Sequence, residues 1–211
     1  PSSMGGPEVD PISYYHVIEE LSKVDGSVGW CTFLSCDGSY YTGWLKAEVG
    51  RTLFGSDPHV RVAASFRALG EAKPVDGGYR VTGRWDYASG IDHANWLTVN
   101  CRVMDENGPK LTSSGDPENR MFLVPAEKAT IYDTWNPMGM LGTGSKDFAV
   151  EQVFVPEDQS WGHWDPAQES SPLYDPRLFM VMAWTPVVAN ALGMARGAMD
   201  AFVELANQSG S

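Results

Sequence analysis

The sequence predicts an α+β chain, in which a helical segment is followed by a small β-barrel or sandwich and then by the start of a C-terminal helical bundle. Three observations support this order: apolar residues recur at helical spacing before residue 58, alternate at strand spacing from 59 to 160, and return to helical spacing after 172. We therefore expect an incomplete helical domain over residues 1–58, a central β-domain over 59–160 and a truncated bundle over 172–211.

The first predicted helix begins at Asp10 and Pro11. An aspartate side chain caps free amide groups, and a proline ring is tolerated in the first turn. Gly26-Ser27 predicts a stop and a restart. The apolar stripe of this helix is predicted to consist of Val17, Leu21, Val24 and Val28.

A second helical segment follows the restart. Glycines are common where helices end, so Gly50 is predicted to end this segment and Gly55 a short third helix. One face of the second segment is predicted to carry Trp30, Leu34, Tyr41 and Leu45.

Beyond Asp57-Pro58 the alternation of apolar and polar residues is typical of strands. A strand-like RVAASFRALG precedes a turn at Asp76-Gly77-Gly78, and later strands are MFLVPAE and DFAVEQVFVPED, with a long polar loop over 105–120. The strand after the turn is predicted to place on one side Tyr79, Val81, Trp85 and Tyr87. In the next strand Leu97, Val99, Cys101 and Val103 alternate with Trp96, Thr98, Asn100 and Arg102.

The C-terminal segment from Asp175 to about Asn207 is predicted to be helical. Gly193 and Gly197 lie four residues apart, which allows a second helix to approach closely. A lone amphipathic helix is marginal in water, so we expect this chain to be a fragment or to rely on another subunit. The predicted stripe is Met194, Ala198, Ala201 and Leu205.

Charge and composition limit the kinds of partner that this chain is expected to bind. Fifteen basic and 27 acidic residues give a net charge of −12, which repels phosphate backbones and anionic membranes. We therefore expect no nucleic acid partner. No apolar run approaches the roughly 20 residues of a membrane span, and PSSMGGPEVD lacks the features of a signal peptide. We expect a cytoplasmic protein with no membrane partner.

The cysteines and histidines do not form a recognised ligand pattern. Cys31, Cys36 and Cys101 are odd in number and match no zinc spacing, so reduced structural thiols are expected. None of the four histidines pairs with a Cys, Asp or Glu at a known ligand spacing. No metal site is expected.

Residues 139–146, GMLGTGSK, resemble a phosphate-binding loop only superficially. The order Ser145-Lys146 is reversed from that motif, and the following residues alternate at strand period instead of opening a helix. The sequence also contains no GxGxxG motif after a strand. Nucleotide hydrolysis and a nicotinamide-binding Rossmann unit are therefore not expected.

Two longer strings carry a family resemblance. VDGGYRVTGRWDYASGIDHANWL, followed by DTWNPMGMLGTGSKDFAVEQVFVPED, resembles the flavin-dependent monooxygenases of the acyl-CoA dehydrogenase fold. The resemblance runs from about Val24 to the end of the chain. It implies the oxygenase component of a two-component enzyme, which takes reduced FMN or FAD from a separate flavin reductase and hydroxylates phenols, ring-opened steroids or aromatic sulfur compounds. A homotetramer assembled through C-terminal helices is also implied.

The resemblance assigns roles to particular residues. Ser89 matches a serine whose hydroxyl and amide lie beside the flavin N5 and O4 atoms. Trp30 matches a tryptophan lining the ring, Ala64-Ser65 a strand end at the pyrimidine edge, and Trp135 a tryptophan near the aromatic pocket. Many family members carry a histidine eight residues after the first tryptophan, where this chain has Gly38.

Physical reasons support these assignments. A hydroxyl held near N5 accepts the hydrogen bond of the N5 proton and slows its loss, which is the role expected for Ser89 as the catalytic residue. Gly90 lets the chain turn without a side chain striking the ring. The rings of Trp30, Tyr87 and Trp135 exclude water and stack on an aromatic substrate. This accounts for the break between two strands at Ser-Gly-Ile-Asp-His.

Simpler structural interpretations stand beside these. Ser89-Gly90 is also compatible with a tight turn alone, and Trp135 with a core residue. Trp85 is expected to pack in the core. Asp92-His93 is expected to be structural, because neighbours on an extended chain point to opposite faces. The segment 142–145 is expected to shape a loop near a subunit interface.

Two rival functions remain open at this stage. An acyl-CoA dehydrogenase on the same fold would need a glutamate base, which usually lies in the helical bundle. The string Trp-Asp-Tyr-Ala-Ser-Gly resembles the hydroxylases more closely. The other rival is a non-catalytic scaffold, in which the β-unit and the aromatic residues serve only packing or association.

Overall fold

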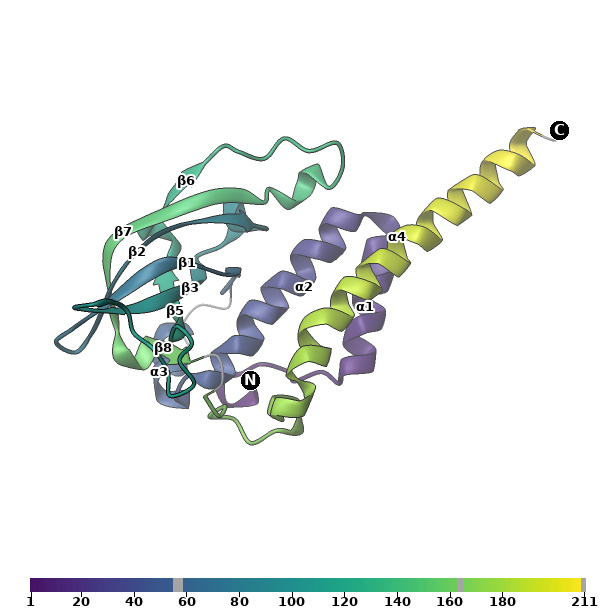
Figure 1. Cartoon of the computed structure of the whole chain (residues 1–211). Coiled ribbons are helices and arrows are strands. Elements are labelled where there is room, and N and C mark those ends of the chain that lie inside the picture. Colours follow the sequence, from purple (N-terminus) through teal and green to yellow (C-terminus); the bar gives the residue numbers. More distant parts are fainter. Residues whose placement is uncertain (55–58, 163–164, 210–211) are drawn as a thin grey trace.

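The computed structural model describes residues 1–54, 59–162 and 165–209. A curved sheet lies beside a layer of helices, and the C-terminal half of the last helix extends past the others (Figure 1). The α-helices are α1 (Pro11–Val24), α2 (Gly26–Tyr41), α3 (Ala47–Phe54) and α4 (Phe179–Ser209). The strands are β1 (Val62–Val75), β2 (Gly78–Ala88), β3 (Trp96–Asp105), β4 (Gly108–Pro109), β5 (Asn119–Pro125), β6 (Thr130–Tyr132), β7 (Lys146–Pro156) and β8 (Ser160–Gly162).

The strands form one open sheet. Seven of them follow the order β6-β7-β2-β1-β3-β5-β8, and β4 pairs with β3. Strands β1 and β3 run parallel, whereas the other pairs are antiparallel. The α+β class is therefore confirmed. The barrel or sandwich is not confirmed, because β6 and β8 are separate ends of the sheet and no pairing among the described residues joins them.

The sheet buries most of the predicted apolar set. Strand β3 buries Leu97, Val99, Cys101 and Val103, as expected. Thr98 is buried as well, on the face where Leu123 packs with Tyr41 at the end of α2 and Trp44 in the turn just after it. Trp85 is a core residue, as predicted: it stacks on Phe148 with ring centroids 5.3 Å apart, and its indole nitrogen donates to the Asn100 carbonyl at 3.0 Å.

Strand β2 departs from its prediction at Tyr87. This side chain is 65% exposed, although Trp85 on the same predicted side is fully buried. The pairing of β2 with β7 shifts between Trp85 and Ala88, and Tyr87 has a φ of +56°. The irregularity turns the Tyr87 ring out of the core. Sequence alternation alone did not indicate it.

Capping explains where the first two helices begin. The Asp10 carboxylate accepts from the Ser13 amide at 3.0 Å, with Pro11 in the first turn. Asp25 separates α1 from α2, and its carboxylate accepts from the amides of Ser27 and Val28 at 2.7 and 3.1 Å. The predicted start at Asp10 and the stop and restart at Gly26-Ser27 are both confirmed.

The predicted stripe of α1 is wrong. Val17, Val24 and Val28 are exposed, whereas Ile18 and Ser22 are buried. The buried face is the one against α4, since a Cβ at Gly193 would lie 2.2 Å from the Glu19 carbonyl oxygen. Close approach of two backbones favours small side chains over a wide apolar stripe.

The ends of the second and third helices also need correction. Helix α2 ends at Tyr41, and Gly50 lies inside α3 instead of terminating the preceding segment. Gly55 and Asp57-Pro58, where the third helix and the helical domain were predicted to end, lie outside the described residues. On α2 the expected face is confirmed at Tyr41, which is buried, and Leu45 just beyond it is buried too.

Helix α4 packs on α1 as its glycines predict. A Cβ at Gly197 would lie 2.4 Å from the Lys23 carbonyl oxygen, so the two backbones approach closely at both glycines. Asn190 is buried beside them and donates to Ser22 Oγ at 2.8 Å and to the Gly26 carbonyl at 2.9 Å. The predicted stripe is exposed at all four of its residues, Met194, Ala198, Ala201 and Leu205.

Helix α4 also changes one expectation about membranes. Residues 176–208 are long and apolar enough to cross a bilayer by length and composition, with a mean hydropathy of 1.6 over an 18-residue window. The expectation that no segment reaches this threshold is therefore wrong. The signal is weak, because a bundle helix of a soluble protein passes the same test. The close packing on α1 fits a bundle helix.

Candidate active site

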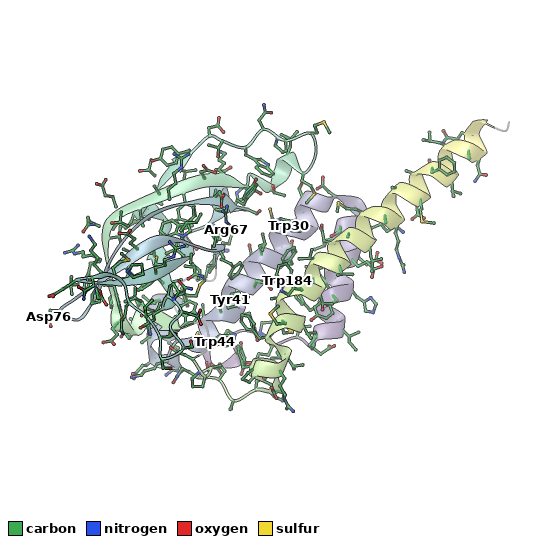
Figure 2. The ribbon with its side chains drawn as sticks, viewed as in Figure 1. Trp30, Tyr41, Trp44, Arg67, Asp76 and Trp184 are labelled. Carbon is green, nitrogen blue, oxygen red and sulfur yellow. The ribbon has the colours of Figure 1, made fainter. Side chains whose placement is uncertain are left out.

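A pocket of about 570 Å³ opens where the sheet faces α2 and α4. Trp30 lies on the helix side of this region and Arg67 on the sheet side (Figure 2). Of the seven residues predicted to hold a cofactor, six line the pocket: Trp30, Ala64, Ser65, Tyr87, Ser89 and Trp135. Gly90 follows Ser89 directly. The structure thus brings together residues from α2, β1, β2 and the loop before β7.

Ser89 lies at the break that interrupts the two strands. Strand β2 ends at Ala88, Gly90 has a φ of +77°, and a short helical turn over Ile91–His93 leads to β3. This left-handed conformation favours glycine. The Ser89 side chain is buried, accepts from the Trp30 indole nitrogen at 3.0 Å, and lies 2.6 Å from Ser145 Oγ. The break is a turn that sets one hydroxyl in the pocket wall.

The amides at this turn are already used within the chain. The Ser89 amide donates to the Tyr87 carbonyl at 2.9 Å, and the Gly90 amide donates to the Thr143 carbonyl at 2.8 Å. The role expected for the Ser89 amide beside a ligand is therefore not available in this arrangement. Its hydroxyl is the polar group that Ser89 contributes.

Tyr87 and Trp135 form an aromatic edge of the pocket. Their rings meet at a right angle, with centroids 6.2 Å apart. Trp135 is half-buried and its indole nitrogen donates to the Met140 carbonyl at 3.3 Å, so it lines the pocket and is not a core residue. A second cavity of about 370 Å³ shares both rings. The positive φ of Tyr87 marks local backbone strain of the kind found at functional sites.

Arg67 and Asp86 add a charged rim that the sequence did not reveal. Their side chains form an ion pair, and the Asp86 carbonyl accepts from Ser65 Oγ at 3.3 Å. Asp86 Oδ1 is buried and has no hydrogen-bond partner among the described residues. A buried acceptor without a donor is costly, so this oxygen is a candidate contact for a ligand N–H or O–H. The two residues lie on different strands, and the alternation of apolar and polar residues along each strand does not indicate that they pair.

Thr143 and Ser145 are also missed pocket residues. Both are buried and line the pocket. Two residues of the segment 142–145 therefore belong to the pocket wall, and its expected position near a subunit interface stays a prediction. The Gly-Thr-Gly-Ser motif was the available signal in the sequence, because it belongs to the strings that carry the family resemblance.

Gly38 and Asp37 lie outside this pocket. A Cβ at Gly38 would lie 2.5 Å from Val62 Cβ, so a larger residue does not fit without a shift. The neighbouring Asp37 is buried in a separate cavity of about 410 Å³ that Tyr14 also lines. Burial raises the pKa of Asp37 to about 8, with the Tyr14 hydroxyl opposing this shift in part.

Asp92 and His93 do not form a catalytic pair. Asp92 pairs with Lys146 at 3.0 Å. The His93 side chain is exposed, and its carbonyl accepts from Arg61 Nε at 2.6 Å. Over the described ranges there is no group of three histidine, cysteine or acidic side chains arranged to hold a metal ion, and all three cysteines are free.

The fold and the pocket define a class of protein. No protein-family profile matches the chain. Its relatives and structural neighbours are oxygenase subunits of flavin-dependent monooxygenases with an acyl-CoA dehydrogenase-like fold, which confirms the resemblance of the two motif strings. The structure of the 3-HSA hydroxylase from Rhodococcus sp. RHA1 matches 99% of this chain and 54% of its own, with a TM-score of 0.88 and 30% identity.

Three further relatives show how similar the chain is to individual proteins of this class. The chain is 31% identical over 211 residues to the oxygenase subunit HsaA of Rhodococcus jostii, matching 97% of this chain and 53% of HsaA. It is 34% identical over 207 residues to the indole-3-acetate monooxygenase of Acinetobacter baumannii, matching 98% and 51%. XiaF from Streptomyces sp., solved with FADH2 and glycerol, has a TM-score of 0.80 and 30% identity over 97% of this chain and 52% of XiaF. The chain spans about half the length of these proteins.

Proposed function

We propose that this chain supplies the sheet and α2 walls of the flavin pocket in the oxygenase component of a two-component flavin-dependent monooxygenase. The observation that carries the proposal is the buried Ser89 hydroxyl, held between Trp30 and Ser145 in a pocket of about 570 Å³. Six predicted cofactor residues from separate parts of the sequence meet there. The similarity to oxygenase subunits supports the same conclusion.

The residues present fit a flavin ring. Apolar and aromatic walls suit a flat heterocycle, while Ser89 Oγ and Asp86 Oδ1 suit its N–H groups. When bound, reduced flavin supplies two electrons to dioxygen, so that one oxygen atom enters the substrate and the other leaves as water. Ser89 holds the N5 proton by accepting its hydrogen bond, and Trp30, Tyr87 and Trp135 exclude water.

The proposed partners and substrate are those expected of a two-component flavin-dependent monooxygenase. We infer that reduced FMN or FAD comes from a separate flavin reductase, and that the substrate is an aromatic or polycyclic compound. Relatives named for indole-3-acetate and for resorcinol support an aromatic substrate. A cytoplasmic location and assembly as a homotetramer through C-terminal helices complete the proposal.

An anaerobic titration tests this function. Dithionite-reduced FMN and FAD are added to the protein, and the solution is then exposed to air in the presence of a phenolic substrate. We expect saturable binding of reduced flavin and hydroxylated product on aeration. Reduction of bound oxidised flavin by an acyl-CoA would instead identify a dehydrogenase. Absence of flavin binding would identify a scaffold and overturn the proposal.

A further inference from the structure

Five groups in the pocket wall form one continuous hydrogen-bonded chain. The Trp30 indole nitrogen lies 3.0 Å from Ser89 Oγ, which lies 2.6 Å from Ser145 Oγ. Ser145 Oγ lies 2.7 Å from Thr143 Oγ1, which lies 2.9 Å from the Met140 carbonyl oxygen. Ser89, Thr143 and Ser145 are all buried. Every distance is within the range of a good hydrogen bond.

One arrangement of protons satisfies all four contacts. A carbonyl oxygen only accepts, so the single Thr143 hydroxyl proton points to Met140. Thr143 must then accept from Ser145, and Ser145 must accept from Ser89. The indole N–H only donates, so it fills one lone pair of Ser89 Oγ. The direction of the whole chain therefore follows from its two ends.

This direction determines what Ser89 can offer to a ligand. Its proton is committed to Ser145 and one lone pair is committed to Trp30, which leaves one lone pair facing the pocket. We propose that Ser145 and Thr143 are positioning residues that hold Ser89 Oγ as a pure hydrogen-bond acceptor toward the bound ligand. The Gly-Thr-Gly-Ser motif thus acts on the pocket through Ser89.

The consequence is selectivity for the reduced state of the cofactor, and this step rests on the proposed function. The N5 atom of reduced flavin carries a hydrogen and donates, whereas N5 of oxidised flavin has a lone pair and accepts. A pure acceptor at Ser89 stabilises the first and repels the second. An oxygenase that takes reduced flavin from a separate reductase and releases oxidised flavin benefits from this difference.

Ser145→Ala tests the assignment. Without Ser145 Oγ the Ser89 proton is free to turn toward the ligand and donate to oxidised N5. We measure the Kd of oxidised and of dithionite-reduced FMN and FAD for the intact protein under anaerobic conditions. The preference for the reduced form should fall roughly five- to tenfold, the effect of about one hydrogen bond. Thr143→Val should shift it in the same direction, and Thr143→Ser should restore it.

Controls separate this proposal from a general structural effect. Ser160→Ala removes another buried serine hydroxyl, bonded to the Glu157 carbonyl at 2.8 Å on β8, and should leave the preference unchanged. In a Ser89→Ala background, Ser145→Ala should add no further shift. Wild type binding both flavins, with an unchanged ratio of the two Kd values in Ser145→Ala and Thr143→Val, would refute the positioning role of Ser145 and Thr143. The proposed flavin site would still stand. If wild type binds neither flavin, both the proposed function and the positioning role of Ser145 and Thr143 are refuted.

Discussion

At the scale of single residues, the proposed chemistry of this chain depends on a few buried side chains that hydrogen-bond to one another. Ser89 Oγ bridges α2 to the loop before β7 through Trp30 and Ser145. Such a bridge couples the cofactor contact to the packing of two elements. Substitutions here should therefore alter ligand chemistry more than stability.

Ser89→Ala removes a hydroxyl from the wall of the proposed flavin pocket. We expect the fold to persist, with a loss of about 1 kcal/mol in the free energy of unfolding. The N5 proton then leaves more readily, so hydrogen peroxide release should rise severalfold relative to hydroxylated product. Coupling is measured as product formed per flavin oxidised. An unchanged ratio in the variant would remove Ser89 from the catalytic role.

Asp37 should make stability depend on pH. Burial raises the pKa of Asp37 to about 8 from an ordinary value of 3.8. Between pH 4 and 8 the folded state then binds one more proton than the unfolded state, so the free energy of unfolding falls as pH rises through this window. The contribution of the Asp37 proton to the free energy of unfolding is fully present below pH 4 and lost above pH 8. Urea unfolding across pH 4–9 measures it.

The matched variants for this effect are Asp37→Asn and Asp76→Asn. Because the pKa rises from 3.8 to about 8, Asp37→Asn should be more stable than wild type by on the order of 6 kcal/mol at pH 9 and nearly equal to it at pH 4. Asp76 lies in the turn between β1 and β2, well away from Tyr41 of α2, the helix that carries Asp37 (Figure 2). Its variant should show a difference that is flat across pH. A flat difference for Asp37→Asn would contradict the burial argument.

At the scale of elements, close backbone approach decides how α4 meets α1. The two helices run side by side in Figure 1, and Gly193 and Gly197 face the carbonyls of Glu19 and Lys23. Lys23 and Asp200 add an ion pair of 2.6 Å at the exposed edge of the contact, where solvent screens it. The glycines therefore matter more than the charges.

Gly193→Val tests this contact. A Cβ there would lie 2.2 Å from a backbone oxygen, so the helices must separate. We expect a loss of about 2–3 kcal/mol in the free energy of unfolding, even though valine favours a helix more than glycine does. Ala191→Val, at an exposed position of the same helix, is the control and should change stability by less than about 1 kcal/mol. Equal effects would exclude steric contact as the cause.

At the scale of the whole molecule, α4 presents an uncovered apolar surface. Figure 1 shows its C-terminal half extending beyond α1 and α2. Exposed apolar side chains along the helix include Trp184, Val188, Leu192, Met199, Phe202 and Leu205. Exposed apolar side chains gathered on one element are typical of association sites. This agrees with the proposed assembly through C-terminal helices.

Association should therefore depend on the end of α4. We expect concentration-dependent self-association in sedimentation velocity, weakened by Phe202→Asp and Leu205→Asp with little change in the unfolding free energy. Val75→Asp, at an exposed apolar position in the hairpin, is the control and should associate as wild type does. A wild-type protein that remains monomeric up to about 100 μM, well above the Kd of a stable dimer, would contradict this expectation.

The sequence alone predicted the features that depend on local chemistry and short periods. Asp10, Gly26-Ser27 and the β1–β2 turn mark element ends because capping and turn geometry involve only a few neighbouring residues. Alternation in β3 placed Leu97 and Val99 in the core. The family resemblance further pointed to Trp30, Ser65 and Ser89 as site residues, and all three line the pocket, although no local pattern relates them.

Tertiary structure decided what depends on elements that are distant in sequence. Which face of α1 is buried follows from the close approach of α4, and the exposure of Tyr87 follows from a shift in pairing with β7. The positions of Arg67, Asp86, Thr143 and Ser145 in one wall depend on β1, β2 and the 140–145 loop meeting. The direction of a hydroxyl proton is set by the partner across the fold, so only the assembled pocket determines that Ser89 accepts.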